Sequence, residues 1–112
     1  MTPGATPGAT PATPPDTKER DVLSAVIERT RKLGGVARRI AYLGRSGAPD
    51  LLLLIPRCQP LLVEVKGPKG KLSPIQASEH VNIAQAGHVV HVVKSFEDID
   101  RMLPLNGGEP CR

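Results

Sequence analysis

Residues 51–55 form an uninterrupted apolar run that starts directly after Pro49-Asp50 and ends at Pro56. A short run without alternating polar positions is typical of a strand that is buried on both faces. Such a strand requires helices that cover both faces of its sheet. The run therefore predicts a mixed α/β domain built around a central sheet.

A first helix is predicted to run to about Lys32. Its cap is Asp16 or Thr17, because either side chain is able to accept a hydrogen bond from a free backbone N–H of the first turn. Val22 and Val26 recur at helical spacing and give the helix an apolar stripe. The Gly-Gly pair that follows Leu33 then ends the helix.

A second helix is predicted after the third strand. Ser73 is its cap, Pro74 its first residue, and Gln76 completes a capping box with Ser73, while Gly87 ends it. The remaining elements are strands at residues 36–43, 50–55, 61–66 and 88–94 and a short helix at residues 96–103. The predicted order is therefore α-β-β-β-α-β with a short C-terminal helix.

Composition divides the chain into three segments. Residues 1–17 are almost wholly Met, Thr, Pro, Gly and Ala, with Asp16 as their only charge, so they are predicted to be a disordered arm. Residues 18–103 form the folded domain, and residues 104–112 form a flexible tail. All fifteen Lys and Arg, but only ten of the eleven Asp and Glu, lie after the arm. This modest basic excess is compatible with a polyanionic partner.

The cysteines and the hydropathy of the chain bear on its compartment. Cys58 and Cys111 are far apart in sequence and lack metal-ligand spacing, which predicts free thiols in a reducing cytoplasm. No secretory signal is visible and no apolar run is long enough to span a bilayer, so we expect no membrane association. Tyr42 and Phe96 are the only aromatic residues, which argues against a protein that binds single strands by stacking bases on rings.

A short turn centred near Arg57 joins the strands at residues 50–55 and 61–66. In an antiparallel hairpin with that turn, Asp50 faces Glu64 across the ladder. Directly opposed residues have Cβ atoms about 4.5–5.5 Å apart, so two carboxylates there repel each other unless a cation lies between them. Mg²⁺ prefers oxygen ligands of this kind. Lys66 projects from the same face as Glu64, because the two are separated by one residue.

Each of these residues also has an ordinary structural interpretation. An aspartate after Gly-Ala-Pro, as Asp50 is, often serves only as a turn residue. Glu64 and Lys66 are also compatible with a solvated pair on an exposed strand face. Their facing register beside a buried strand favours a catalytic site over either interpretation alone.

The same residues carry a resemblance to a known family. The chain resembles a VRR-NUC domain, a compact member of the PD-(D/E)xK nuclease superfamily, over roughly residues 18–103. This resemblance implies a restriction-endonuclease-like core, whose element order agrees with the one predicted above. The residues that carry it are Glu19, the run at 44–50, Glu-Val-Lys at 64–66, Gly67, Lys-Leu-Ser at 71–73, Gln76, and the segments 87–90 and 94–98.

The resemblance implies a nuclease that depends on Mg²⁺ or Mn²⁺. Asp50 and Glu64 would be the principal metal ligands, and the backbone carbonyl of Val65 would be a further one. Lys66 would position the attacking water or stabilise charge on the phosphate. These four residues form the predicted catalytic centre.

Two more residues of this centre have two interpretations each. Glu19 matches an acidic residue that the first helix of the family supplies to the metal. It would equally stabilise the helix dipole and close a capping box with Asp16, in which case Glu28 is a substitute ligand. Gln76 would reach the metal site, serve only as the capping partner of Ser73, or do both.

The other polar candidates are less specific. The histidines His80, His88 and His91 share no metal-ligand spacing and are interpreted as surface or core side chains. Five basic residues near the predicted site are candidates for salt-dependent phosphate contacts, although each is equally compatible with a solvated charge. These residues are Arg38, Arg39, Arg45, Lys69 and Lys71.

The resemblance is to small stand-alone VRR-NUC proteins of phages and bacteria. It implies a DNA endonuclease that cuts branched DNA such as four-way (Holliday) junctions, as in DNA repair, in the cytoplasm of a bacterium or a phage-infected host. It also implies a homodimer, which suits such a substrate because nicks on two symmetric strands need two sites. A restriction-like or flap-type nuclease of the same fold is an alternative, and a non-catalytic DNA-binding module is an alternative of a different class.

Overall fold

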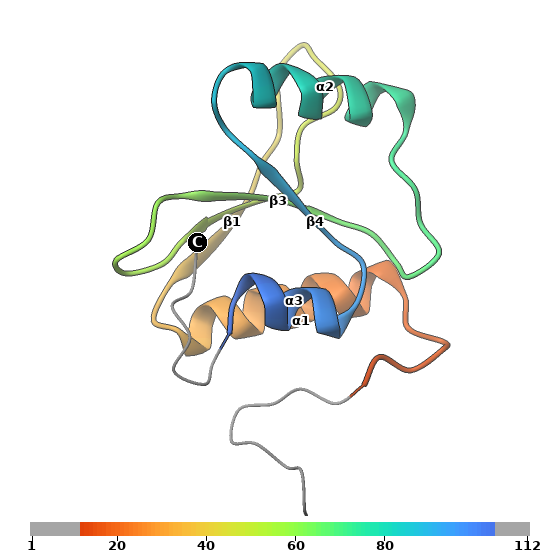
Figure 1. Ribbon diagram of the computed structural model, residues 1–112, viewed down its shortest axis with the longest axis vertical. Helices are drawn as coiled ribbons and strands as arrows, with labels where there is room; N and C mark the ends of the chain where they lie inside the picture. Colours follow the sequence, from red (N-terminus) through yellow and green to blue (C-terminus); the bar gives the residue numbers. More distant parts are fainter. Residues whose placement is uncertain (1–11, 105–112) are drawn as a thin grey trace, which may run out of the picture.

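The computed structural model describes residues 12–104 and places one sheet between helices (Figure 1). The order of elements is the predicted one, so the α/β class is confirmed. The predictions that the arm is disordered and that the tail is flexible fall mostly on residues outside this range. The helices are α1 (Glu19–Lys32), α2 (Pro74–Gln85) and α3 (Phe96–Met102), and the strands are β1 (Val36–Arg39), β2 (Leu51–Leu54), β3 (Leu61–Val65) and β4 (Val90–Val93).

The four strands form one sheet in the order β1-β2-β3-β4. β1, β2 and β3 pair antiparallel. β4 runs parallel to β3, and the chain reaches it through α2, since a parallel pair requires a long crossover. β1 and β4 are shorter than predicted, because β1 ends at Arg39 and β4 begins at Val90. After β1 the chain turns at Gly44 and Gly47, whose φ angles of 73° and 97° favour glycine.

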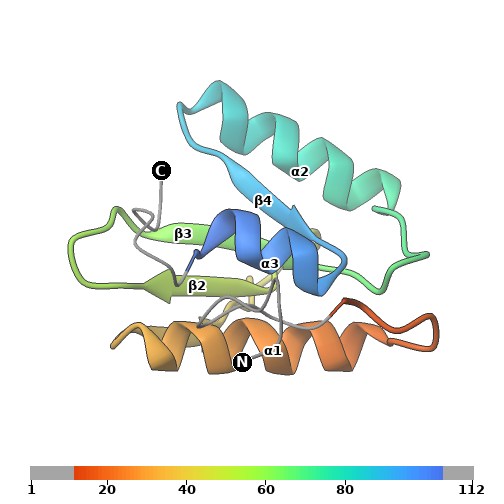
Figure 2. The same ribbon diagram turned by 60° about the horizontal axis from the view of Figure 1, so that its bottom comes forward.

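The hydrophobic core lies between the sheet and the pair of helices α1 and α3. Figure 2 shows α1 running along this face of the sheet, with α2 on the opposite side. Arg29 of α1 is also buried here, and it donates hydrogen bonds to the carbonyl of Leu103 at 2.5 Å and to Asp100 at 2.6 Å. The buried apolar residues are Val22, Val26, Leu51, Leu53, Ile55, Leu61, Val63, Val65, Val93, Ile99 and Leu103.

The prediction that residues 51–55 are buried on both faces is wrong. Leu51 and Leu53 are fully buried toward α1 and α3, whereas Leu54 on the other face is 43% exposed. In the described part of the chain, α2 is the one helix on that other face, and it packs against β4. The half of the sheet that contains β2 is therefore uncovered on this side, because a single helix is too narrow to cover four strands.

The start of α1 differs from the prediction. Its cap is Lys18, not Asp16 or Thr17. The backbone N–H of Lys18 donates a hydrogen bond of 2.9 Å to the carboxylate of Asp21. Asp21, rather than Glu19, therefore satisfies the backbone at this helix end, which removes the capping role proposed for Glu19.

Two contacts beyond the core were not anticipated from the sequence. The Thr13 hydroxyl accepts a hydrogen bond of 2.8 Å from the backbone N–H of Phe96 and also bonds Glu97, so this N-terminal segment lies against α3.

Cys58, in the turn between β2 and β3, is disulfide-bonded. The expectation of a free thiol at this position is wrong, because sequence separation does not set the distance between cysteines in a folded chain. Cys111 lies outside the described residues.

Candidate active site

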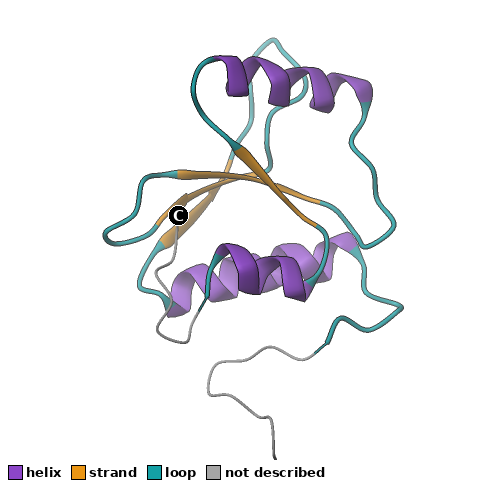
Figure 3. Ribbon diagram, viewed as in Figure 1, coloured by secondary structure: helices purple, strands orange, loops and turns teal. Residues whose placement is uncertain are grey.

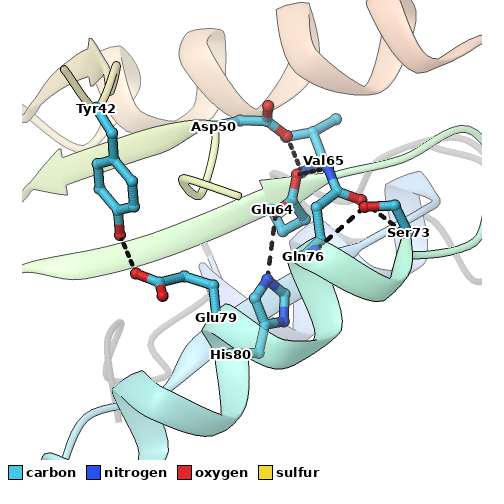
Figure 4. Close-up of polar contacts among 8 residues, drawn as sticks. All are labelled: Tyr42, Asp50, Glu64, Val65, Ser73, Gln76, Glu79 and His80. Atoms are coloured by element: carbon cyan, nitrogen blue, oxygen red, sulfur yellow. Dashed lines mark hydrogen bonds and ion pairs between the residues drawn. The ribbon is translucent and has the colours of Figure 1, made fainter. Parts of the chain in front are cut away.

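Asp50 lies where the chain enters β2, beside Glu64 of β3. The ladder pairs Leu51 with Val63, and one further step along this register brings Asp50 next to Glu64. The register predicted from the turn is therefore confirmed. Oδ2 of Asp50 accepts a hydrogen bond of 2.7 Å from the backbone N–H of Val65 (Figure 4). This bond fixes the Asp50 carboxylate to the strand that carries Glu64.

Glu64 is fully buried on the face of the sheet that α2 covers. Burial is the main reason that its pKa is raised from 4.5 to about 8; the Asp50 carboxylate adds to this increase, and Lys66 opposes it. A carboxylate that is dry and faces a second carboxylate is costly to ionise. The pair therefore holds a proton, or needs a cation, at neutral pH.

Two side chains of α2 contact the Glu64 carboxylate (Figure 4). Nε2 of Gln76 donates to Oε2 at 3.4 Å, and Nε2 of His80 lies 3.2 Å from Oε1. Oε1 of Gln76 meanwhile accepts from the backbone N–H of Ser73 at 2.9 Å, and the hydroxyl of Ser73 accepts from the backbone N–H of Gln76 at 3.1 Å. The capping role of Gln76 is therefore confirmed, and its second amide atom contacts Glu64, while its predicted action on the metal site stays a prediction.

His80 is partly buried, which agrees with the expectation of a surface or core side chain, but its contact with Glu64 was not anticipated. Its side chain is 13% exposed and packs beside Glu64. Burial lowers the pKa of His80, the nearby Lys66 lowers it further, and Glu79 acts in the opposite direction. The sequence does hold a signal, since His80 follows Gln76 by four residues and so shares its helix face. His88 is exposed and His91 is half-buried, as expected.

Lys66 directly follows β3. Its backbone N–H donates a hydrogen bond of 3.0 Å to the carbonyl of Val93, which extends the parallel pairing by one residue. Its charge lowers the pKa of both Glu64 and His80, so the ammonium group acts on the predicted centre. Gly70 folds back over it, because a Cβ atom at Gly70 would lie 3.1 Å from the Lys66 Cβ.

Glu19, the first residue of α1, is brought to the same end of the sheet. A Cβ atom at Gly67 would lie 3.2 Å from the Glu19 backbone nitrogen, so the start of α1 packs against the residue that follows Lys66. The negative charge of Glu19 also raises the pKa of Glu64. Glu28, the substitute ligand, instead pairs with Arg31 at 2.6 Å on the exposed side of α1. The position of Glu19 therefore favours Glu19 over Glu28 as the acidic residue that α1 supplies to the site.

The donor set suits a cation that needs few protein ligands. Within residues 12–104, no three His, Cys, Asp or Glu side chains are grouped closely enough to hold a metal ion together. Zinc sites normally need at least three such ligands. Mg²⁺ instead binds through one or two carboxylates and fills its remaining positions with water and substrate phosphate. Asp50 and Glu64 fit that pattern, and the predicted Val65 carbonyl would add an oxygen beside them.

Glu79 holds the loop that precedes Asp50 against α2, a role that sequence analysis missed. Its carboxylate accepts hydrogen bonds from the hydroxyl of Tyr42 at 2.6 Å, from Arg45 at 3.1 Å and from Asn82 at 3.3 Å. Figure 3 shows this loop, between β1 and β2, reaching the level of α2. The bond from Tyr42 is the main reason that the pKa of Glu79 is lowered.

The five basic candidates differ in their surroundings. Arg45 pairs with Glu79 while its side chain remains 61% exposed. Arg38 and Arg39 are exposed on β1 and, as neighbours on a strand, project from opposite faces, so they do not act on one site together. Lys69 and Lys71 are exposed in the loop that follows Lys66. These two lysines lie nearest in sequence to the centre.

Comparison with known proteins decides the family. Residues 15–97 match the VRR-NUC domain. The chain belongs to the VRR-NUC family. It is 34% identical over 87 residues to "Putative nuclease p44" of Acyrthosiphon pisum secondary endosymbiont phage 1, covering 78% of this chain and 92% of that protein. A solved structure described as "VRR_NUC domain" is 42% identical, covers 77% of this chain and 94% of its own, and superposes with a TM-score of 0.71.

Membership of the VRR-NUC family makes this a nuclease domain. The family match covers all of the residues gathered around Glu64, from Glu19 on α1 to His80 on α2. The similar solved structure agrees with the mixed α/β architecture described above. In the described part of this VRR-NUC chain, no helix is long and apolar enough to cross a membrane.

Proposed function

We propose that this chain is a Mg²⁺- or Mn²⁺-dependent DNA endonuclease that hydrolyses phosphodiester bonds. The observation that carries the proposal is the pairing of Asp50 with the buried Glu64, whose pKa is raised to about 8. A divalent cation between the two carboxylates would replace the proton that they otherwise share. The repulsion between the two carboxylates therefore favours the binding of a cation.

Each residue of the centre has a defined task in this proposal. When bound, the metal ion supplies charge that polarises the phosphoryl oxygens and lowers the pKa of a water molecule. Asp50, Glu64 and the Val65 carbonyl would hold the ion, and Glu19 of α1, which is not grouped with both acids closely enough to bind it directly, would reach it through bound water. Lys66 would orient the attacking water or neutralise charge that develops on the phosphate.

DNA is the polyanion that the basic residues would bind. Lys69, Lys71 and Arg45 are exposed and lie on segments adjoining Lys66 or Asp50. Contacts of this kind are independent of base sequence and weaken as the salt concentration rises. Arg38 and Arg39 would contribute separately, one on each face of β1.

Branched DNA, such as a four-way junction, is the substrate class that we propose, with a homodimer as the active species. Two sites related by a two-fold axis would cut two symmetric strands. The outer surface of α2 supports this proposal, because Val81 is 55% exposed there, and Ile75, on the side of α2 that faces Gly47, is 57% exposed. A second copy of the chain would remove these apolar side chains from water.

Two alternatives are distinguished by activity. A restriction-like or flap-type nuclease would use the same Asp50, Glu64 and Lys66 but cut linear or flapped DNA. A non-catalytic DNA-binding module would bind DNA and cut none. The intact set of two acids and a lysine favours the enzymes over this module.

The test is a cleavage assay with matched four-way, flapped and linear DNA, in Mg²⁺, in Mn²⁺ and in EDTA. The proposal expects metal-dependent cutting, fastest on the four-way junction, that Glu64→Gln abolishes while DNA binding persists. Faster cutting of flaps or linear DNA would select the alternative enzyme. Binding without cleavage in either metal would refute a nuclease function.

A further inference from the structure

The inner face of α2 is mostly polar, which is unusual for a helix that packs on a sheet. Such helices normally bury an apolar stripe. Among the residues of α2, all of which the structure describes, Glu79 is the one that is buried. Gln76, His80 and Ile83 are the partly buried residues around it, so Ile83 is the one apolar side chain on this face, whereas Val81 is largely exposed. Contacts to polar groups therefore account for most of this face.

Two of these polar residues hold the same carboxylate. Gln76 contacts Oε2 of Glu64, and His80 contacts Oε1 at 3.2 Å. Together they contact both oxygens from the α2 side. An ionised carboxylate offers about four lone-pair positions, so these two contacts still leave the carboxylate able to bind a cation.

We propose that His80 is a positioning residue that sets the orientation of the Glu64 carboxylate for metal binding. It donates Nε2–H to Oε1 of Glu64 and so prevents this oxygen from rotating away from Asp50. This inference rests on the proposed metal-dependent function and adds to it a residue from α2. Groups that hold a ligand of a metal ion in this way typically change metal affinity or activity by about 10–100-fold when removed.

Three variants test this role: His80→Ala, His80→Gln and, as a matched control, His88→Ala at an exposed histidine. Mn²⁺ affinity is measured directly by calorimetry without DNA, and cleavage is measured across a range of Mg²⁺ concentrations. His80→Ala should weaken Mn²⁺ binding by about 10–100-fold, with kcat largely restored at saturating metal and the KM for DNA unchanged. His80→Gln should recover most of the affinity, because its amide nitrogen reaches the position of Nε2.

Several results would overturn the inference. Unchanged Mn²⁺ affinity in His80→Ala, or a fall as large in His88→Ala, would show that His80 does not act through Glu64. If His80→Gln binds Mn²⁺ as weakly as His80→Ala, the imidazole ring does something other than donate one hydrogen bond. If His80→Ala fails to fold, His80→Gln should still bind Mn²⁺ more tightly than His80→Asn, whose amide is too short, and equal affinities would refute the role.

The wild-type protein separates this inference from the function on which it rests. If wild type neither binds Mn²⁺ nor cuts DNA, the metal-dependent function itself fails, and the role of His80 fails with it. If wild type does both and His80→Ala matches it, only the role of His80 fails.

Discussion

The carboxylate of Asp50 accepts a 2.7 Å hydrogen bond from the backbone N–H of Val65, the residue next to Glu64. This bond joins the start of β2 to the end of β3, just beyond the last residue pair of the β2–β3 ladder. It holds Asp50 beside a second carboxylate in spite of their repulsion. The geometry of the centre thus exists before any cation binds.

The first prediction concerns Asp50→Asn. The amide oxygen still accepts the bond from Val65, but the charge beside Glu64 is lost. Cleavage should fall by about 10²–10³-fold, because a weakened metal site forfeits several kcal/mol of transition-state stabilisation. The metal-free variant should unfold at the same or a higher urea concentration than wild type, since one of two repelling carboxylates is gone. A large loss of metal-free stability would contradict this account.

The second prediction is a pH dependence of stability that comes from Glu64. Its pKa is about 8 in the folded protein and near its ordinary value of 4.5 when unfolded. The folded state therefore binds more protons between these values, so this contribution is fully present below 4.5 and is lost as pH rises through about 8. Metal-free urea unfolding should show it as a fall in stability as pH rises from 4.5 to about 8.

The control for this pH effect is Glu64→Gln, which does not titrate. The difference in stability between wild type and variant should change with pH in the direction given, which removes the effect of other titrating groups. Saturating Mg²⁺ should reduce the loss at high pH, because the cation replaces the proton. A difference that does not vary with pH would show that the Glu64 carboxyl titrates normally.

The third prediction separates the two roles of Gln76. Ser73→Ala removes only the helix cap and should cost about 1 kcal/mol of stability with little effect on cleavage. Gln76→Ala should cost a similar amount of stability and should also lower cleavage, since it removes the contact with Glu64. Urea unfolding and cleavage rates of both variants give the comparison. Equal cleavage by the two would leave Gln76 with a capping role alone.

The fourth prediction concerns the start of α1. Glu19→Ala should reduce cleavage steeply while leaving stability nearly unchanged, because Asp21 and not Glu19 receives the bond from Lys18. Asp21→Ala should do the reverse, with a loss of about 1 kcal/mol and near-normal cleavage. Measured together, the two variants test whether Glu19 serves the metal site. Wild-type cleavage by Glu19→Ala would exclude it.

The fifth prediction concerns the homodimer. Val81→Glu places a charge on the exposed surface of α2, where Val81 is 55% exposed. If this surface joins two copies, sedimentation velocity should show a shift from dimer to monomer, with the monomer fold intact. Ser24→Glu puts the same charge on an exposed position of α1 and should leave the dimer unchanged. Equal dimerisation of both variants would place the interface elsewhere.

The sequence alone predicted the order of the elements and the register that brings Asp50 beside Glu64. Strand and helix periodicity, the Ser73–Gln76 capping box and the turn near Arg57 are all local features. The turn was sufficient to place Asp50 opposite Glu64, because a hairpin fixes its register over the few residues on either side. The family match then agreed with what these residues had indicated.

Which remote side chains meet depends on how the helices pack on the sheet. His80 approaches Glu64, and Glu79 holds Tyr42 and Arg45, because α2 packs across one half of the sheet. The same placement leaves Leu54 exposed, contrary to the prediction from its apolar run. Local patterns state which face of an element is apolar, but the position of a covering helix depends on packing between segments that lie far apart in the chain.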